Sequence, residues 1–293
     1  MDLGRVGLWT FQLDPQPMSR AREIAQELES LGYGAIWLPE SVGRDPFASA
    51  ALLLQATERI AFATGIASIH ARSPMTMRAG WHTLTEAFPD RFLLGLGVSH
   101  QPAVEGLHRQ DYGKPLAKMR AHLDAIDQSI FFAREPSSTP RRVLAALGPK
   151  MLALAAERAD GAHPYFVPPE HTALAREILG PDKLLAVEQM AVLVDDADQA
   201  RELARATMRI YTNLPNYANN LRRLGFTDDD LTTISDRLVD AIVVWGDEDA
   251  VRARVQQHHE AGADHVCVQV LPTDGFTGLP LAEWRRLASA LLA

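Results

Sequence analysis

Two kinds of segment alternate along the chain, and they differ in the spacing of their apolar residues. Short apolar runs are each followed by a longer segment in which apolar residues recur every three or four positions, as Ile24, Leu28 and Leu31 do. The short runs predict buried strands, and the longer segments predict helices that cover them. The runs that predict strands are residues 5–11, 34–40, 60–69, 91–98, 142–148, 161–167, 183–194 and 264–272.

Eight strand–helix units in succession predict a parallel sheet, which we expect to close into an α/β (β/α)8 TIM barrel. An open doubly wound sheet is the rival architecture, but it would more often split a chain of 293 residues into two domains. No Ser/Gly-rich linker marks such a split. We therefore expect a single domain over residues 1–293, with a helical insertion at about residues 195–245 before the last strand.

Composition and charge narrow the class of partner. The net charge is −8, from 29 basic and 37 acidic residues, which disfavours nucleic acid or an anionic membrane as the main partner. The N-terminus lacks the pattern of a signal peptide, and no apolar run approaches transmembrane length. The single cysteine, Cys267, lies in an apolar run and is expected to be a buried thiol. These features fit a cytoplasmic protein that acts on a small molecule.

The active site of a TIM barrel lies at the carboxyl ends of its strands. Here those ends mix aromatic residues, glycines, a carboxylate and histidines, which suit a flat, anionic organic ligand better than a metal. The histidine and cysteine residues show no spacing typical of a metal site. His258 and His259 are adjacent on a predicted helix and so point apart, and we expect both at the surface. The glycines of residues 95–97 begin a dinucleotide-binding fingerprint, but the pattern fails at His100.

The segment VLAALGPKM, residues 143–151, passes from a predicted strand to a predicted helix through Gly148, Pro149 and Lys150. Proline suits the first helical position, and a helix N-terminus beside a cation can hold an anion. The same pattern also fits an ordinary turn with a solvated lysine. On the residues of this segment alone, we favour the ordinary turn.

Three further stretches lie at the predicted strand ends: GYGAIWLPES (32–41), ATGIASIHARSPMTMRAGWHTLTEAFPDRFLLGLGVSHQP (63–102) and ALGPKMLALAAERADGAHPYFVPPEH (146–171). Together they resemble the bacterial luciferase-like monooxygenase superfamily, and within it the actinobacterial branch assigned to the deazaflavin coenzyme F-420. The resemblance runs from the first strand to the last. It implies a TIM barrel with an extended insertion, which binds a flavin or deazaflavin at the carboxyl ends of the strands.

The resemblance also implies cofactor-binding residues. It implies a non-prolyl cis peptide between Gly65 and Ile66, which bulges the third strand against the middle ring of the cofactor. It places the acidic Glu40 near the ring and Ser68 at its edge. The turn after the fifth strand meets the cofactor phosphate in the family, so the anion-binding interpretation of that turn is preferred. The expected cofactor-binding residues are Glu40, Gly65, Ile66, Ser68, Gly97, Val98, Ser99, Gly148, Pro149, Lys150 and Met151.

Catalytic and substrate-binding residues follow from the same resemblance. Many relatives carry a catalytic histidine directly after the acidic residue, where this chain has Ser41. His100, at the end of the fourth strand, can supply the protonatable group instead, because the histidine pKa lies nearest neutrality. We therefore expect Ser41 and His100 at the catalytic centre. The expected substrate pocket is formed by Trp9, His70, His163 and Tyr165.

The resemblance implies an oxidoreductase that uses reduced coenzyme F-420 for hydride transfer to or from a small organic substrate. An FMN-dependent two-component monooxygenase shares the fold and the pocket and is the alternative. A catalytically silent flavin-binding barrel is the alternative of another class, and Ser41 in place of the histidine favours it. The resemblance further implies a homodimer formed through the helices after the early strands, and a separate reductase could supply the reduced cofactor.

Overall fold

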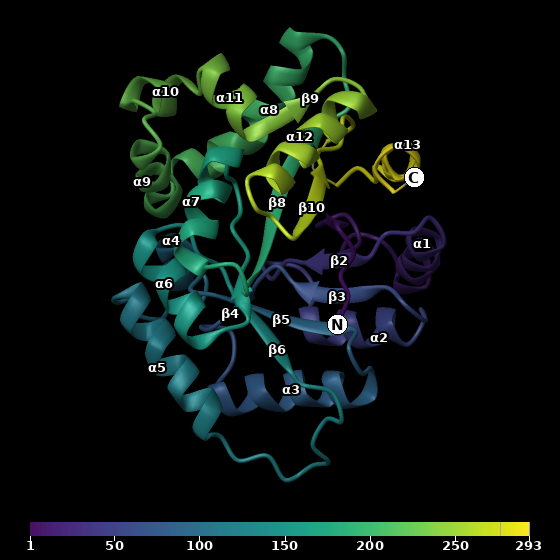
Figure 1. Cartoon of the computed structure of the whole chain (residues 1–293), viewed down its shortest axis with the longest axis vertical. Helices are drawn as coiled ribbons and strands as arrows, with labels where there is room; N and C mark the ends of the chain where they lie inside the picture. Colours follow the sequence, from purple (N-terminus) through teal and green to yellow (C-terminus); the bar gives the residue numbers. More distant parts are fainter. Residues whose placement is uncertain (276, 293) are drawn as a thin grey trace.

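A closed parallel barrel forms the centre of the computed structural model, which describes residues 1–275 and 277–292 (Figure 1). The strand β10 pairs with both β1 and β8 and so closes the ring. Each of the eight barrel strands lies within a run predicted from the sequence, except that β6 begins one residue before its run, so the predicted TIM barrel is confirmed. The barrel strands are β1 (Val6–Trp9), β2 (Ala35–Leu38), β3 (Ala61–Thr64), β5 (Phe92–Gly97), β6 (Arg141–Leu144), β7 (Gly161–Ala162), β8 (Leu184–Val192) and β10 (His265–Val270).

The third strand is interrupted at the position where a bulge is expected. The peptide bond between Gly65 and Ile66 is cis, and the short strand β4 (Ala67–Ser68) resumes the sheet by pairing with β5. A Cβ atom added to Gly65 would lie 2.6 Å from Trp9 Nε1, and one added to Gly97 would lie 2.3 Å from Ile66 Cδ1. The Trp9 ring fills the space that a side chain on Gly65 would need, whereas the atom that one on Gly97 would meet is the flexible end of the Ile66 side chain.

Helices cover the outside of the barrel, and several begin at a proline in the first turn, where no amide hydrogen is needed. The side chain of Asp45 caps one of them by accepting from the amides of Phe47 and Ala48. These helices are α1 (Met18–Ser30), α2 (Pro46–Leu54), α3 (Pro74–Ala87), α4 (Gln101–Gly106), α5 (Pro115–Gln128), α6 (Pro149–Arg158), α7 (Pro169–Leu179), α12 (Glu248–Glu260) and α13 (Leu281–Leu291).

An insertion of helices precedes the last strand, as predicted, and it lies beyond one end of β8 (Figure 1). Its helices are α8 (Ala197–Thr212), α9 (Pro215–Arg223), α10 (Asp228–Thr233) and α11 (Asp236–Ile242). They share an apolar cluster that includes Met208, Leu221, Leu238 and Val243. The sequence did not predict β9 (Val243–Trp245), which ends the insertion and pairs in parallel with the end of β8.

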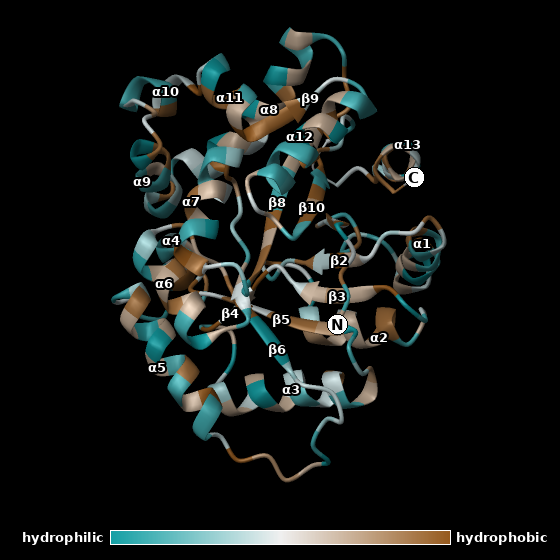
Figure 2. Ribbon diagram, in the orientation of Figure 1, coloured by the Kyte–Doolittle hydropathy of each residue, from teal (hydrophilic) through white to brown (hydrophobic). Residues whose placement is uncertain are grey.

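The barrel interior is filled by side chains, and β9 is hydrophobic along its length, whereas β8 and β10 are mostly hydrophobic with a few polar residues (Figure 2). Trp37 is fully buried there, and its indole N–H donates to His265 Nε2 at 3.0 Å. Cys267 is also fully buried, as predicted. Among the described residues, no helix combines the length and the apolar character that crossing a membrane would require.

The prediction that His258 lies at the surface is wrong. Its side chain is fully buried, with Nε2 2.8 Å from Gln189 Oε1 and Nδ1 2.8 Å from the Thr172 hydroxyl. Burial lowers its pKa to about 3, so the ring is neutral. Neighbouring residues on a helix point about 100° apart, so α12 turns His258 toward β8 while His259 stays half-buried beside Ala263.

Candidate active site

A cavity of about 510 Å³ lies at the carboxyl ends of the strands, between the barrel and the insertion. Its wall is built from residues that follow β1, β2, β3, β5, β6 and β7, completed by residues of α8 and α9. Most of the predicted site residues line it together. They are Trp9, Glu40, Ser41, Gly65, Ile66, Ser68, Gly97, Val98, Ser99, His100, Gly148, Met151, His163 and Tyr165.

Trp9 and His163 line the cavity where it meets the barrel interior. The Trp9 indole N–H donates to the Gly65 carbonyl oxygen at 2.9 Å. His163 stacks on Trp37 with ring centroids 4.1 Å apart, and its Nδ1 donates to the Ala186 carbonyl oxygen at 2.9 Å. Burial lowers the pKa of His163 to about 4, so its ring is neutral at pH 7. Its Nε2 then carries a lone pair, and this buried atom has no hydrogen-bond partner among the described residues.

Glu40 is not a free carboxylate. Its Oε2 accepts from the Ser68 amide at 2.6 Å and from the Arg72 guanidinium at 3.0 Å, and Arg72 also bonds Oε1. Arg72 bonds Asp45 as well and lies 4.7 Å from the centre of the Phe47 ring. The charge of Glu40 is therefore balanced within the protein, and the carboxylate fixes the backbone of Ser68 at the cavity wall.

The two expected catalytic residues lie at the edge of the cavity. His100 is half-buried, with Nδ1 3.3 Å from Asn216 Oδ1 and its ring 5.4 Å from the Tyr217 ring. Burial lowers the pKa of His100, and the bond to Asn216 opposes that shift only in part. The ring is therefore largely neutral at pH 7, and it can accept or donate a proton. Ser41 is exposed and lines the cavity directly after Glu40.

A cationic side chain lies beside the turn at Gly148, but it belongs to Arg223 and not to the predicted Lys150. Lys150 is exposed and, like Pro149, does not line the cavity. Arg223, from the last turn of α9, does line it, and a Cβ atom placed on Gly148 would lie 3.4 Å from its Nη2. The Met151 amide already donates to the Gly148 carbonyl oxygen at 3.0 Å. The amides of Gly148 and Lys150 remain for an anion, because first-turn amides have no acceptor within the helix.

The insertion supplies an aromatic wall that the sequence did not indicate. Tyr211 and Tyr217 line the cavity, with their ring centroids 5.4 Å apart. The Tyr165 hydroxyl lies 2.7 Å from the Tyr211 hydroxyl and 2.8 Å from Gln269 Oε1, which joins the insertion to the barrel. These residues come from distant parts of the chain, so no local pattern could have grouped them.

Comparison with known proteins identifies the family. A family model described as luciferase-like monooxygenase matches residues 2–265. The chain belongs to the luciferase-like monooxygenase family. Its relatives include "Putative coenzyme F-420-dependent oxidoreductase" from Mycobacterium tuberculosis, which is 27% identical and aligns over 92% of this chain and 94% of its own length.

Two solved structures of the luciferase-like fold resemble this protein over nearly its whole length. The coenzyme F-420-dependent tetrahydromethanopterin reductase from Methanopyrus kandleri superposes with a TM-score of 0.78 at 15% identity, covering 98% of both chains. The oxygenating constituent of 3,6-diketocamphane monooxygenase from Pseudomonas putida, in complex with FMN, superposes with a TM-score of 0.70 at 16% identity, covering 97% of this chain and 95% of its own. At these identities the likeness shows the fold alone.

His70 lies behind the cavity of this luciferase-like protein and does not line it. Its amide donates to the Ser68 hydroxyl at 3.2 Å, and its buried ring stacks at 6.0 Å on Tyr112, which does line the cavity. Burial lowers the pKa of His70. The residue therefore supports the wall rather than contacting what the cavity holds.

Glu188, inside the predicted strand 183–194, is a buried acid that the sequence gave no reason to single out. Its Oε2 accepts from the Phe166 amide at 3.0 Å, whereas its Oε1 has no partner among the described residues. Burial raises the pKa of Glu188 to about 8, and the bond from Phe166 opposes this shift. The carboxyl group is therefore largely protonated at pH 7 and holds the segment that carries Tyr165.

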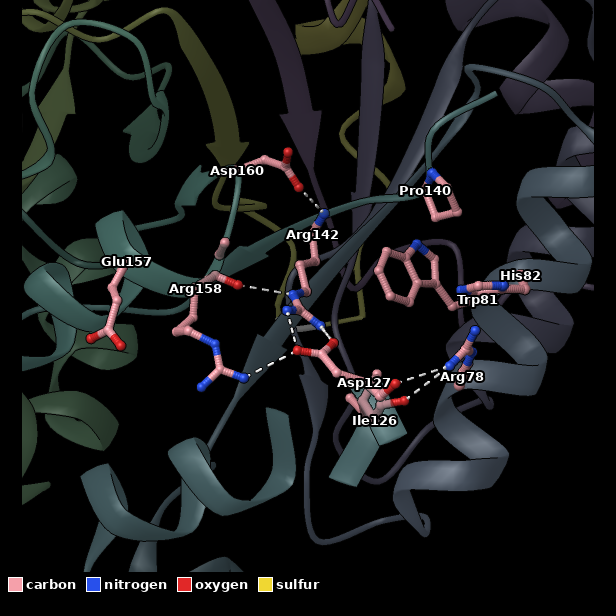
Figure 3. Close-up of a pocket in the computed structure, with 11 residues that line it drawn as sticks. Arg78, Trp81, His82, Ile126, Asp127, Pro140, Arg142, Glu157, Arg158 and Asp160 are labelled. Carbon is pink, nitrogen blue, oxygen red and sulfur yellow. Dashed lines mark hydrogen bonds and ion pairs between the residues drawn. The ribbon is translucent and has the colours of Figure 1, made fainter. Parts of the chain in front are cut away.

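A second cavity, of about 520 Å³, lies at the other end of the barrel, where β6 begins and α5 and α6 end (Figure 3). Its charges are paired with one another: Asp127 bonds Arg142 at 2.6 Å and Arg158 at 3.1 Å. None of the predicted site residues lines it. Among the described residues, no group of three or more His, Cys, Asp or Glu side chains could hold a metal ion. The cavity at the carboxyl ends of the strands is therefore the candidate active site.

Proposed function

We propose that this protein is an oxidoreductase that binds coenzyme F-420 in the cavity and exchanges a hydride with a small organic substrate. The observation that carries the proposal is the position of Arg223 beside the Gly148 turn, at one edge of a cavity whose other walls combine aromatic and apolar residues with uncharged polar ones and the paired Glu40. Such a cavity suits a flat ring system with an anionic tail. The name of the Mycobacterium tuberculosis relative supports the same cofactor.

The residues present fit this cofactor. The bulge at Gly65 and Ile66 and the neighbouring Val98 would pack against the ring, with Ser68 at its polar edge. The Gly148 amide, with Arg223, would hold the anionic tail. When bound, F-420 carries the hydride at C5 of its deazaflavin ring. The protein orients the two reactants and excludes water, and His100 can exchange a proton with the substrate.

An FMN-dependent monooxygenase is the second candidate, and the likeness to the diketocamphane monooxygenase favours it. Titration of the purified protein with F-420 and with FMN, followed by fluorescence, distinguishes the two. We expect F-420 to bind more tightly. Submicromolar binding of FMN with no binding of F-420 would overturn the proposal, and cofactor binding without turnover on a broad substrate panel would favour a silent barrel.

The two cations near the turn should differ in their effect on cofactor binding. Arg223→Ala removes a guanidinium that lines the cavity, so we expect the Kd for F-420 to rise about tenfold, as for one charge-assisted hydrogen bond. Lys150→Ala removes an exposed cation outside the cavity and should raise it less than about threefold. Equilibrium titration of both variants, with circular dichroism to check folding, tests this. Equal effects would show that the tail does not lie between Gly148 and Arg223.

We also propose that two copies of the chain associate through α2 and α3. Each helix exposes a large apolar side chain, Leu52 with 39% and Met75 with 60% of its surface accessible. Burial of such side chains stabilises an interface. Light scattering at micromolar concentration is expected to give the mass of a dimer, and Met75→Lys should lower it toward that of the single chain. A monomeric mass for the unaltered protein would contradict the proposal.

A further inference from the structure

The turn between β6 and α6 contains a backbone amide that is free to bind a ligand. The Gly148 oxygen accepts from the amides of Met151 and Leu152, each at 3.0 Å. The Leu147 oxygen lies 2.8 Å from Nε2 of His171. The Gly148 amide, by contrast, donates to no acceptor among the described residues, as is usual for the residue that precedes a helix.

His171 is the donor in its bond to Leu147. A carbonyl oxygen can only accept, so Nε2 carries the ring proton. Burial lowers the pKa of His171, and the positive charge of Arg223 lowers it further, although the bond to Leu147 opposes the shift. The ring is therefore neutral at pH 7, and it contributes a hydrogen-bond donor and no charge.

The histidine ring is costly at this position. Its side chain is 2% exposed, and the buried Nδ1 has no partner among the described residues. A buried acceptor without a donor costs free energy, which an apolar side chain of similar size would avoid. What the histidine adds is the bond to the Leu147 carbonyl oxygen, so the role of the residue lies in that bond.

This bond acts on Gly148 because a peptide group is planar. The peptide bond between Leu147 and Gly148 is trans, so its C=O and N–H groups point in opposite directions. Holding the Leu147 carbonyl toward His171 therefore fixes the direction of the Gly148 N–H group. A hydrogen bond to the carbonyl also polarises the peptide group, which makes its N–H a stronger donor.

His171 approaches the turn from behind the cavity wall. Leu147 and Gly148 line the cavity, whereas His171 does not. The guanidinium of Arg223 lines it too, and its Nη2 donates at 3.2 Å to Asn220 Oδ1, one turn earlier in α9. Both donors at this edge, the Gly148 amide and the Arg223 guanidinium, are thus held by residues outside the cavity lining.

We infer that His171 is a positioning residue for the cofactor phosphate: it holds the Leu147 carbonyl and so aims the Gly148 amide at the phosphate oxygen. The inference rests on the proposed function, which places the anionic tail at this turn. Without the bond, the peptide group would have to be oriented when the phosphate binds, and that ordering would weaken binding. An amide that is already oriented avoids this loss.

Titration with cofactor forms that have and lack the phosphate tests the inference. We expect His171→Leu to raise the Kd for F-420 about tenfold, as for one weakened charge-assisted hydrogen bond. The Kd for the same deazaflavin ending at its ribityl hydroxyl, without phosphate, should stay within about twofold, because the contacts to the ring are unchanged. His171→Gln can present an N–H group at a similar reach and should bind F-420 within about threefold of wild type.

His265→Leu is the matched control for the loss of a buried histidine. Nδ1 of His265 also donates at 2.8 Å to a carbonyl oxygen, that of Gly4, and its side chain is 1% exposed. The residue begins β10, at the end of the barrel opposite the cavity. We expect this variant to lose stability in urea unfolding and to keep the wild-type Kd for F-420.

Spectra of 15N-glycine-labelled protein follow the Gly148 amide directly, and Gly148→Ala identifies its signal among the 19 glycines. Saturation with F-420 should move the Gly148 amide proton to lower field in wild type and in His171→Gln, and less in His171→Leu. If His171→Leu does not fold, the other two proteins still decide, because a Gly148 signal that F-420 leaves unmoved overturns the inference.

The titrations also overturn the inference if His171→Leu weakens F-420 and the phosphate-free deazaflavin equally, weakens neither, or behaves like His265→Leu. FMN and riboflavin form a second pair that differs in phosphate, and they are titrated in parallel. If FMN binds and F-420 does not, the proposed function fails, and the second pair judges His171 in the same way. Binding of neither F-420 nor FMN overturns both.

Discussion

Replacing Glu188 by glutamine is expected to make the free energy of unfolding far less dependent on pH. The buried carboxyl has its pKa raised from 4.5 to about 8, so between these values the folded state holds a proton that the unfolded state has released. The wild-type protein therefore loses stability as pH rises from about 4.5 to 8. At about 1.4 kcal/mol per pH unit, the variant should gain up to ~5 kcal/mol relative to wild type across this range.

Urea unfolding at pH 5, 6.5 and 8 measures the effect. The amide of glutamine keeps an oxygen for the Phe166 amide, so the packing is preserved. Glu177→Gln on α7 is the matched control, because that carboxylate is exposed. A difference between Glu188→Gln and wild type that stays constant with pH would show that the carboxyl group is ionised in the folded protein.

Replacing Arg72 by alanine is expected to lower the free energy of unfolding by about 3 kcal/mol, because it leaves the Glu40 carboxylate without its cation. Both side chains of this pair are 12% exposed, and Glu40 also fixes the Ser68 amide. The variant should also bind cofactor more weakly, since Ser68 lines the cavity. Urea unfolding at neutral pH, with cofactor titration, gives both quantities.

Two further variants show whether the loss of stability in Arg72→Ala comes from the broken ion pair with Glu40 or only from the removal of a long side chain. The double variant Arg72→Ala with Glu40→Ala should recover part of the lost stability, because no unpaired charge remains. Arg59→Ala breaks the exposed pair with Glu58 and should change stability by less than about 0.5 kcal/mol. If Arg72→Ala behaves like Arg59→Ala, the carboxylate of Glu40 is well hydrated and the pair does not organise the wall.

Much of the barrel could be predicted because its signals are local. Each strand is an apolar run of a few residues followed by a helix with its own periodicity, and both patterns arise from neighbours in the sequence. The approximate position of the site followed from the same reasoning, since the carboxyl ends of parallel strands meet at one face. Trp9, Gly65 and His163 could be placed there from the sequence for that reason.

The partners within the site could not be predicted, because they depend on contacts between distant segments. Arg223 reaches the Gly148 turn from a helix 75 residues further along the chain, and nothing in its own neighbourhood indicates this. The pairing of Glu40 with Arg72 removes the free carboxylate that the strand end suggested. His258 was misplaced for a related reason: an isolated helix pattern does not say which of two adjacent polar residues faces the barrel.

The short strand β9 gives the insertion a fixed attachment to the sheet. It joins β8 in register from Met190 opposite Val243 to Val192 opposite Trp245, through backbone hydrogen bonds that nearly any side chain permits. The helices that precede β9 do not pair with the sheet. Mutations on α8 can therefore accumulate without changing the pairing between β8 and β9. They can change the side of the cavity that carries Tyr211 while the walls built by the barrel strands stay as they are, and directed mutagenesis of that helix can follow the same route.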